Sequence, residues 1–275
     1  MRVALISNAK AAGVPAAVEP VCAALQGLGA AVLLPVGGGE FPPSGADDIL
    51  RECDIAIALG GDGTIIHTAK RAARFGKPVL GINCGHLGFM AGLELDELDR
   101  LPAVIEGRFD LERRMLLEIL VRSGEKVSRF SALNEAVISR GALSRMIAID
   151  VENHGEPVVS YHADGVILAT PTGSTAYSLS AGGPVIDPDL NALLLTPICP
   201  HSLFSRSYIF HERACLTVRA SGSAPAYLMV DGEEGLEIEE DDVVTVTRSS
   251  TDACLIKIKQ TSFYGVLSQK LMNRR

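Results

Sequence analysis

The sequence predicts a two-domain protein of the α/β + β class: an N-terminal parallel α/β domain followed by a C-terminal antiparallel, β-sandwich-like domain. Its 275 residues exceed a typical single domain. The first third alternates strand-like and helix-like runs, which indicates parallel strands joined by crossover helices. After Leu111 short strand-like runs and compact turns dominate. We place the domains at residues 1–108 and 109–260 and expect residues 261–275 to pack back on the first domain.

In the N-terminal domain, continuously apolar runs predict strands, and apolar residues at helical spacing predict helices. The expected strands cover residues 3–7, 31–34, 55–59 and 79–82. The expected helices cover residues 16–28, ended by Gly29, and about 65–74, ended by Gly76 and Pro78. The Gly/Pro-rich stretch 37–46 is expected to be a loop.

In the C-terminal domain, the expected strands are short and numerous. They cover residues 116–122, 137–139, 147–152, 158–162, 166–169, 216–220, 226–230, 243–247 and 255–259. Asn153-His154-Gly155 and Asp231-Gly232 are typical turn sequences. Residues 175–195 are rich in Ala, Ser and Leu and are expected to be partly helical. Phe263, Val266, Leu267 and Leu271 have the spacing of a helix that needs a partner surface.

Composition excludes several classes of protein. There are 25 Lys and Arg against 33 Asp and Glu, a net charge of -8, which argues against a general nucleic-acid binder. No apolar run reaches the roughly 18 residues that a membrane span needs, and the first ten residues do not resemble a signal peptide. The six cysteines form no C-x-x-C pair. We therefore expect a cytoplasmic protein, without a membrane partner, whose thiols are free and mostly buried.

The strongest local motif is Gly60-Gly61-Asp62-Gly63-Thr64, between an apolar strand and a helix. The glycines allow a tight turn and close approach of a ligand, and the helix start favours phosphate. A carboxylate at an anion-binding turn has two chemical uses: taking a proton from a hydroxyl, or holding Mg²⁺. The alternative is that Asp62 or Thr64 only caps the helix.

This motif resembles the glycine-rich turns of diacylglycerol- and sphingosine-type lipid kinases, phosphofructokinases and NAD kinases. Later segments are similar to NAD kinases alone, in order and over nearly the whole chain. They are Gly81–Phe89 (GINCGHLGF), Asn134-Glu135, Asp164-Gly165, Thr170–Tyr177 (TPTGSTAY), Ser180–Pro184 (SAGGP), Pro197–Leu203 (PICPHSL) and Asp231-Gly232. We identify the chain as resembling bacterial, ATP- or polyphosphate-dependent NAD kinases.

The resemblance implies phosphoryl transfer to the 2′-hydroxyl of the adenosine ribose of NAD, which gives NADP. Asp62 would take the proton of that hydroxyl. The phosphate loop of Gly60, Gly61, Gly63 and Thr64 would hold the phosphates of ATP together with Mg²⁺ or another divalent cation. ATP, another nucleotide and polyphosphate all remain open as the donor, as do NAD and NADH as the acceptor.

The resemblance also implies a set of substrate-binding residues. The Asn134 amide suits the N6/N7 edge of adenine, Glu135 suits a ribose diol, and the hydroxyl-rich block after Asp164 suits ribose, amide and phosphate groups. The full set is Asp62, Gly63, His67, Phe89, Asn134, Glu135, Arg145, His162, Asp164, Thr172, Thr175, Ala176, Tyr177, Ser178, Leu179 and Ser180. Two positions depart from the family pattern: His162 replaces Arg or Lys, and Cys84 replaces Arg or Thr.

Two other functions are alternatives to NAD kinase activity. A lipid kinase would need an apolar pocket for acyl chains, and a non-catalytic dinucleotide sensor would be better served by a neutral residue than by Asp62. The resemblance further implies a homodimer or homotetramer joined through the β domain. The apolar run 192–198 is a candidate for that contact, with ordinary core as the alternative.

Overall fold

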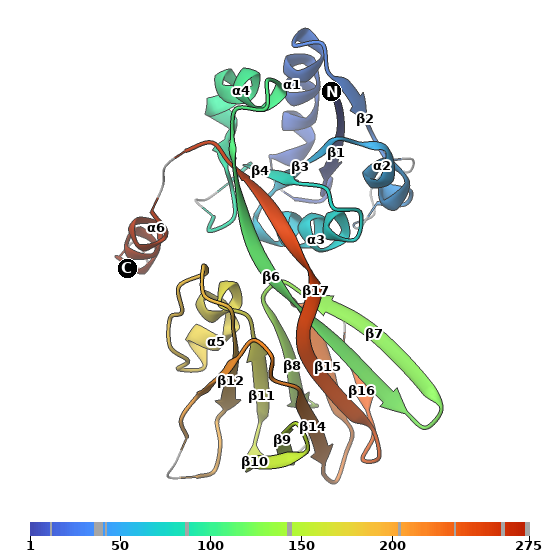
Figure 1. Cartoon of the computed structure of the whole chain (residues 1–275), viewed down its shortest axis with the longest axis vertical. Coiled ribbons are helices and arrows are strands. Elements are labelled where there is room, and N and C mark those ends of the chain that lie inside the picture. The colour runs from blue at the N-terminus through green and yellow to red at the C-terminus, as the bar shows by residue number, and fades with distance from the viewer. Residues whose placement is uncertain are drawn as a thin grey trace. The chain divides into compact units, whose positions relative to one another are not determined.

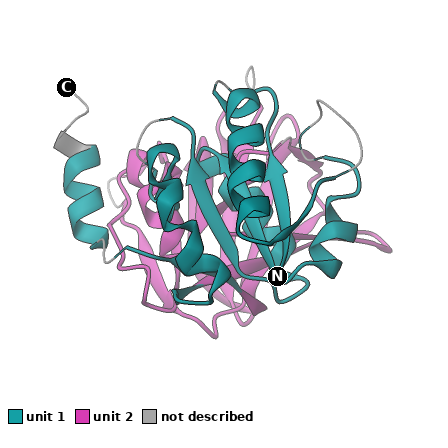
Figure 2. Ribbon diagram, turned by 90° about the horizontal axis from the view of Figure 1, so that it is seen from above, with its two compact units in different colours: residues 1–113, 253–275 teal, residues 114–252 magenta. Residues whose placement is uncertain are grey.

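A computed structural model describes residues 1–11, 13–35, 41, 43–85, 88–141, 145–202, 205–233, 235–259 and 262–272. The chain divides into two compact units (Figure 2). Unit 1 comprises Met1–Arg113 and Ala253–Arg275, and unit 2 comprises Arg114–Asp252. Two long strands, β6 (Asp110–Ser123) and β17 (Val243–Lys257), connect the units.

Unit 1 contains a parallel sheet in the order β2-β1-β3-β4, with the C-terminal end of β17 beside β4. Its strands are β1 (Arg2–Ser7), β2 (Ala31–Leu33), β3 (Ile55–Gly60), β4 (Val79–Asn83) and the short β5 (Leu93–Glu94). Its helices are α1 (Val14–Gly27), α2 (Ala46–Glu52), α3 (Asp62–Ala73), η1 (Leu95–Arg100), α4 (Leu101–Ile105) and α6 (Phe263–Met272) (Figure 1).

Helices cover both faces of this sheet. Leu80 and Ile82 of β4 belong to a core cluster that also includes the buried face of α1. Gly81, between them, faces the other way, and a Cβ there would lie 2.6 Å from Ile65 of α3. Because β3 is buried at all six positions, its sequence is continuously apolar instead of alternating.

Unit 2 is built from antiparallel strands in two groups. One sheet has the order β13-β12-β11-β8-β15-β16, and in the other group β10, β9, β14 and β17 are neighbours in that order, with the β6–β7 hairpin beside β17. The remaining bounds are β7 (Lys126–Ala132), β8 (Glu135–Arg140), β9 (Ile147–Asn153), β10 (Glu156–Ala163), β11 (Gly165–Ala169), η2 (Thr172–Thr175), α5 (Tyr177–Ser180), β12 (Ala192–Ile198), β13 (Tyr208–His211), β14 (Leu216–Ser221), β15 (Ala226–Val230) and β16 (Leu236–Ile238).

The core of unit 2 takes alternate residues from both groups of strands. Leu117 and Ile119 of β6, Ile138 of β8, Val151 of β9 and Leu195 of β12 all belong to it. Alternation of this kind is expected when two sheets pack face to face. The predicted fold class, parallel α/β followed by an antiparallel β domain, is therefore confirmed.

Several element predictions were wrong. Helix α3 begins at Asp62, not near residue 65. The strand expected at 243–247 and residues 255–257 of the strand expected at 255–259 both belong to the single strand β17, which ends at Lys257. Within 175–195, the expected partial helix is confirmed as α5, whereas strand β12, which begins at Ala192, was not predicted. The elements that were not predicted include the helices α2, η1 and α4 and the strands β5, β7, β13 and β16. Of the loop expected at 37–46, residues 37–40 and 42 lie outside the described residues.

Two further expectations concern burial. All six cysteines are free, but Cys53 alone among them is buried and Cys199 is exposed, so the expectation of mostly buried thiols was wrong. The apolar run 192–198 is strand β12, which is buried at its first six positions inside unit 2. Its apolarity is thus explained by the core. No helix in the described ranges is long and apolar enough to cross a membrane.

Candidate active site

The glycine-rich turn links the end of β3 to the start of α3. Gly60 has φ 156°, and a Cβ at this position would lie 2.5 Å from the Oγ1 of Thr64, so the turn requires glycine there. The backbone N–H groups of Thr64 and Ile65 both donate to the Gly61 carbonyl, at 3.0 and 3.2 Å. These bonds close the first turn of α3, so the positive dipole end of the helix lies at the glycine-rich turn, where it favours a phosphate.

Asp62 is the first residue of α3, and its carboxylate bonds to a different segment of the chain. Its Oδ2 accepts a hydrogen bond from the Phe89 N–H at 3.1 Å, and its Oδ1 accepts one from the Met90 N–H at 3.3 Å. A Cβ on Gly88 would lie 2.2 Å from Oδ1, so only glycine permits this approach. No side-chain cap is found at the start of α3 among the described residues, which counts against the capping alternative.

A cation faces the same carboxylate. The Nζ of Lys270, on α6, lies 3.3 Å from the Oδ2 of Asp62 and 4.1 Å from the centroid of the Phe89 ring. The side chains of Asp62 and Lys270 keep 31% and 26% of their surface exposed. Both groups are therefore held in place and still accessible to a ligand. Lys270 could not be predicted from a sequence motif, because 208 residues separate it from Asp62.

Unit 1 has further residues that the sequence analysis singled out, on α3 and at the end of β4. His67, one turn into α3, is half-buried, with its ring 4.9 Å from that of Phe41. Asn83, at the end of β4, donates to the Oε2 of Glu94 at 2.9 Å, and burial raises the pKa of that carboxyl. Cys84 is half-buried, and burial raises the pKa of its thiol. His86 and Leu87 of the GINCGHLGF segment lie outside the described residues.

In unit 2, Asp231 organises the Asn134-Glu135 pair. Its carboxylate accepts hydrogen bonds from three consecutive backbone N–H groups: Leu133 at 2.9 Å, Asn134 at 2.8 Å and Glu135 at 3.0 Å. Asp231 has φ 49°, a left-handed conformation that Asp tolerates better than most residues. The sequence predicted a turn at Asp231 and missed this second role.

Glu135 is a buried carboxyl, with 6% of its surface exposed. Burial and the neighbouring charge of Asp231 raise its pKa to about 7, against a smaller lowering by a hydrogen bond from the Tyr177 backbone. Within the described structure its Oε2 accepts no hydrogen bond. The group is thus an acceptor with spare capacity, as a ribose diol would require.

The segment that begins at Thr170 packs directly on Asn134. The Thr170 Oγ1 donates to the Leu133 carbonyl at 2.5 Å and accepts from the Gly173 N–H at 3.0 Å. A Cβ on Gly173 would lie 2.1 Å from the Asn134 carbonyl oxygen. The Asn134-Glu135 pair and the segment from Thr170, about 40 residues apart in sequence, therefore pack against each other in unit 2.

Within the hydroxyl-rich block, some hydroxyls are committed to the fold. The Oγ of Ser178, fully buried, lies 3.0 Å from the Oγ1 of Thr196. The Thr172 Oγ1 accepts a hydrogen bond from Arg114 at 3.2 Å, and both residues are buried. The remaining predicted residues of the block are more open: Thr175, Ala176 and Leu179 are half-buried, and Tyr177 and Ser180 are exposed. Ligand contacts of the whole block stay a prediction.

The other predicted residues of unit 2 surround β10 and β11. Asp164 accepts a hydrogen bond from the Nε of Arg140 at 2.6 Å, an ion pair that the sequence analysis missed. His162 is exposed, and its carbonyl accepts from the His201 N–H at 2.7 Å. Arg145 is exposed. Leu203 of the PICPHSL segment lies outside the described residues.

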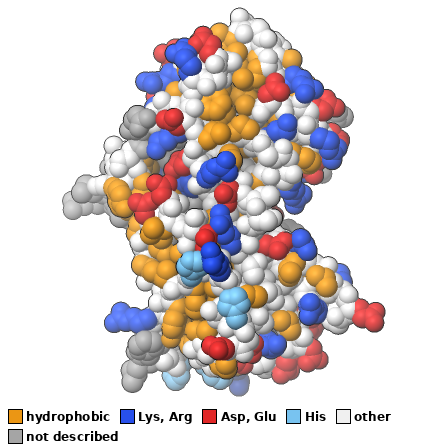
Figure 3. Space-filling model, in the orientation of Figure 1, with side chains coloured by type: hydrophobic (Ala, Val, Ile, Leu, Met, Phe, Trp, Pro, Cys, Tyr) orange, Lys and Arg blue, Asp and Glu red, His pale blue; other side chains and the backbone are white. Residues whose placement is uncertain are grey.

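The described residues contain no cluster of three or more His, Cys, Asp or Glu that could hold a metal ion. Mg²⁺ that is bound mainly by substrate phosphates uses only one or two protein carboxylates. In the glycine-rich turn, Asp62 is the carboxylate available for it. On the face seen in Figure 3, Lys and Arg are interspersed with Asp and Glu.

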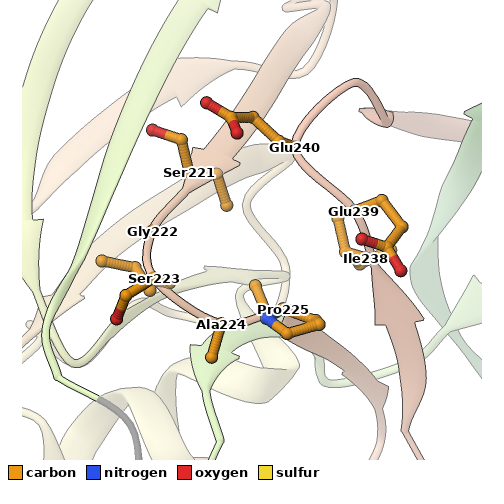
Figure 4. Close-up of a pocket in the computed structure, with 11 residues that line it drawn as sticks. Ser221, Gly222, Ser223, Ala224, Pro225, Ile238, Glu239 and Glu240 are labelled. Carbon is orange, nitrogen blue, oxygen red and sulfur yellow. The ribbon is translucent and has the colours of Figure 1, made fainter.

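Unit 2 also has a shallow pocket of about 200 Å³ between the turn 221–226 and the end of β16 (Figure 4). Its charged lining residues are Glu239 and Glu240, and none of its lining residues belongs to the predicted site. The pocket is therefore separate from the residues discussed above.

Comparison with known proteins identifies the family. The model of the ATP-NAD kinase N-terminal domain matches residues 44–109, and that of the ATP-NAD kinase C-terminal domain matches residues 133–258. An NAD kinase from Symbiobacterium thermophilum is 45% identical over 265 residues, covering 92% of each chain. An NAD kinase from Caldanaerobacter subterraneus is 43% identical over 232 residues, covering 83% of this chain and 82% of the relative.

Solved structures agree with these relatives. Yeast NADH kinase, solved with NADH, superposes with a TM-score of 0.89 at 26% identity, over 100% of this chain and 88% of that one. An NAD kinase from Archaeoglobus fulgidus, solved with ATP, gives 0.79 at 26% identity, over 98% and 99%. The glycine-rich turn, the Asn134-Glu135 pair and the hydroxyl-rich block thus occur together in a chain that belongs to the ATP-NAD kinase family.

Proposed function

We propose that this chain transfers the terminal phosphoryl group of ATP to the 2′-hydroxyl of the adenosine ribose of NAD, and that Asp62 is the general base. The observation that carries the proposal is the Asp62 carboxylate, held by two backbone N–H groups at the start of α3, where phosphate is favoured. A residue that merely capped the helix would instead bond to the N–H groups of α3 itself.

The proposed reaction has one transfer step. The 2′-hydroxyl oxygen of NAD forms a bond to the terminal phosphorus of ATP while its proton passes to Asp62. The bond between that phosphorus and the bridging oxygen breaks, and its electron pair leaves with ADP. Mg²⁺, when bound, would neutralise the charge of the donor phosphates that the glycine-rich turn holds. Positioning and charge neutralisation supply most of the rate in such reactions.

Unit 2 would bind the adenosine part of NAD. We assign adenine to the Asn134 amide and the ribose diol to Glu135, whose Oε2 is free to accept a hydrogen bond within the described structure. Asp231 would position both residues through their backbone N–H groups. Arg145, His162, Asp164 and residues 175–180 would complete the contacts with NAD. Because the Ser178 hydroxyl is hydrogen-bonded to Thr196, we expect Ser178 to contact NAD through its backbone.

The decisive experiment incubates the pure protein with Mg²⁺, NAD and a donor, and assays NADP. ATP, GTP and polyphosphate are compared as donors, and NAD and NADH as acceptors. We expect NADP from ATP and NAD. Absence of NADP with every donor, in protein that binds NAD, would favour a dinucleotide sensor instead. Phosphorylation of diacylglycerol or sphingosine in vesicles would favour a lipid kinase.

We also propose that the chain forms a homodimer or homotetramer. The run 192–198 is not the contact, since β12 lies in the core of unit 2. Light scattering at assay concentration tests the assembly, and an active monomer would contradict it.

A further inference from the structure

The helix α6 places one stripe of residues against unit 1. Phe263, Val266, Leu267 and Lys270 are half-buried and lie at positions i, i+3, i+4 and i+7, whereas Tyr264 between them is 60% exposed. The Phe263 ring lies 6.4 Å from that of Phe89. Two turns later on the same face, the Lys270 ammonium reaches both Asp62 and the Phe89 ring. The stripe therefore brings one cation to the glycine-rich turn.

The proposed reaction creates an electrostatic problem at this turn. The Asp62 carboxylate and the terminal phosphate of the donor are both negative, and they must lie close together if Asp62 is to deprotonate the attacking hydroxyl. Like charges at such a distance repel each other, and a cation beside them offsets that repulsion. In the described part of the chain, Lys270 is the cation that forms an ion pair with Asp62.

Resting on the function proposed above, we propose that Lys270 binds the terminal phosphate of the donor and is a catalytic residue of the transfer. Its ammonium pairs with Asp62 before the donor binds and with the oxygens of the transferred phosphoryl group afterwards. A lysine suits this exchange, because its charge sits on a flexible four-carbon chain and binds phosphate from several directions. Lys270 forms no covalent bond in the transfer.

The Phe89 ring makes the exchange possible. Its face attracts the ammonium at 4.1 Å from the ring centroid, an interaction that does not fix the direction of the N–H groups. The backbone N–H of the same residue holds Asp62 at 3.1 Å. One residue thus positions the base through its backbone and the cation through its ring.

Nucleotide binding tests the proposal without requiring turnover. The Kd values of Mg·ATP and Mg·ADP are measured by calorimetry, without NAD, for the wild type, Lys270→Met and the neighbouring exposed control Gln269→Met. If Lys270 contacts the terminal phosphate, Lys270→Met should weaken ATP binding about tenfold and leave ADP binding unchanged. Gln269→Met should change neither. Equal effects of Lys270→Met on ATP and ADP, or none on either, would overturn the proposal.

Turnover provides the second test, in wild-type protein first shown to make NADP. Lys270→Met should lower kcat about 10- to 100-fold, with the KM for NAD nearly unchanged, and Lys270→Arg should recover part of the loss. An unchanged or raised kcat in folded Lys270→Met, judged by its melting temperature, would also refute the proposal. If the wild type makes no NADP, the proposed function fails, and the comparison of ATP with ADP still decides whether Lys270 binds the terminal phosphate.

Discussion

The chain contains Asp-Gly pairs in both units, and two of them show how differently the same dipeptide can be used. At Asp62-Gly63 in unit 1, the carboxylate accepts two backbone N–H groups and faces the Lys270 ammonium, with a third of its surface exposed. At Asp231-Gly232 in unit 2, the carboxylate accepts three consecutive N–H groups at 2.8–3.0 Å. The first carboxylate has a lysine ammonium as a partner, and the second holds three consecutive backbone N–H groups.

This difference separates the carboxylate that is proposed to react from a structural one. A carboxylate that holds consecutive backbone donors fixes the conformation of that segment, so its loss should be felt as instability. A carboxylate that shares its charge with a flexible lysine can exchange that partner for a substrate. We therefore expect substitutions of Asp62 to change turnover and those of Asp231 to change stability.

The largest expected effect is that of Asp62→Asn on turnover. Asn keeps the size of the side chain but cannot take a proton near neutral pH, so kcat should fall about 10²–10⁴-fold. The melting temperature and NAD affinity should change little, because the adenosine contacts are assigned to unit 2. The measurement is kcat across a Mg²⁺ series. Rescue by extra Mg²⁺ would make Asp62 a metal ligand instead of the base, and near-normal turnover would remove it from the reaction.

Asp231→Ala should have the converse effect. It removes the acceptor of three backbone hydrogen bonds and places Ala at φ 49°, so we expect a loss of about 3–5 kcal/mol in the free energy of unfolding. Asp231→Asn, which tolerates this φ and keeps one acceptor oxygen, is the matched control and should lose less. Urea titration of both variants gives the values. A stability equal to that of the wild type in Asp231→Ala would contradict the structural role.

The Glu135 carboxyl should make the free energy of unfolding depend on pH. Its pKa rises from 4.5 when unfolded to about 7 when folded, so the folded state holds the extra proton between these values. The stabilising contribution is present below pH 4.5 and disappears as the pH rises through 7, a change of about 3 kcal/mol.

Glu135→Gln, which cannot titrate, should therefore gain stability relative to the wild type between pH 5 and pH 8. Urea unfolding of both proteins across this range measures the difference. A difference that does not vary with pH would show that the Glu135 carboxyl is not shifted. NAD affinity of the wild type should fall below about pH 7, as the carboxylate that is proposed to bind the ribose becomes protonated.

The smallest expected effect comes from two glycines. In Gly173→Ala, the new Cβ would meet the Asn134 backbone at 2.1 Å, which should cost about 1–3 kcal/mol of stability through strain. Gly61→Ala, whose Cβ would meet nothing within 4 Å, is the control and should be nearly neutral for stability. Thermal unfolding compares the two. Equal melting temperatures would show that the packing of residues 170–173 on Asn134 is loose.

The fold class was predictable because the signals are local. The continuously apolar β3 and the helical spacing in α1 indicate a parallel sheet, and the density of short apolar runs indicates the β domain. The errors also have local causes. The poor helix propensity of glycine predicts a loop at Asp62 and Gly63, whereas these residues form the first turn of α3. Strand β17 was divided in two because Arg248–Asp252 is polar in the middle of it.

The candidate site was predictable only where its residues form motifs. Asp62, Asn134 and Glu135 stand out by their neighbours in sequence, whereas Lys270, Arg114 and Arg140 are single basic residues in ordinary surroundings. Their partners, Asp62, Thr172 and Asp164, are at least 24 residues away in the chain. The chemistry of the Ser178 side chain predicts a ligand contact, whereas in the structure its hydroxyl is buried and hydrogen-bonded to Thr196.

The division of unit 1 into two stretches of chain has a consequence for synthesis. Ribosomes add about 5–20 residues per second, so the 114–252 stretch delays the rest of unit 1 by on the order of ten seconds. During that interval β4 lacks its neighbour β17, and Asp62 lacks Lys270, while unit 2 is already complete in sequence. A nascent chain therefore completes the unit that is proposed to bind the nucleoside before the unit that is proposed to hold the phosphates. Its last helix to emerge is the one that brings the cation to Asp62.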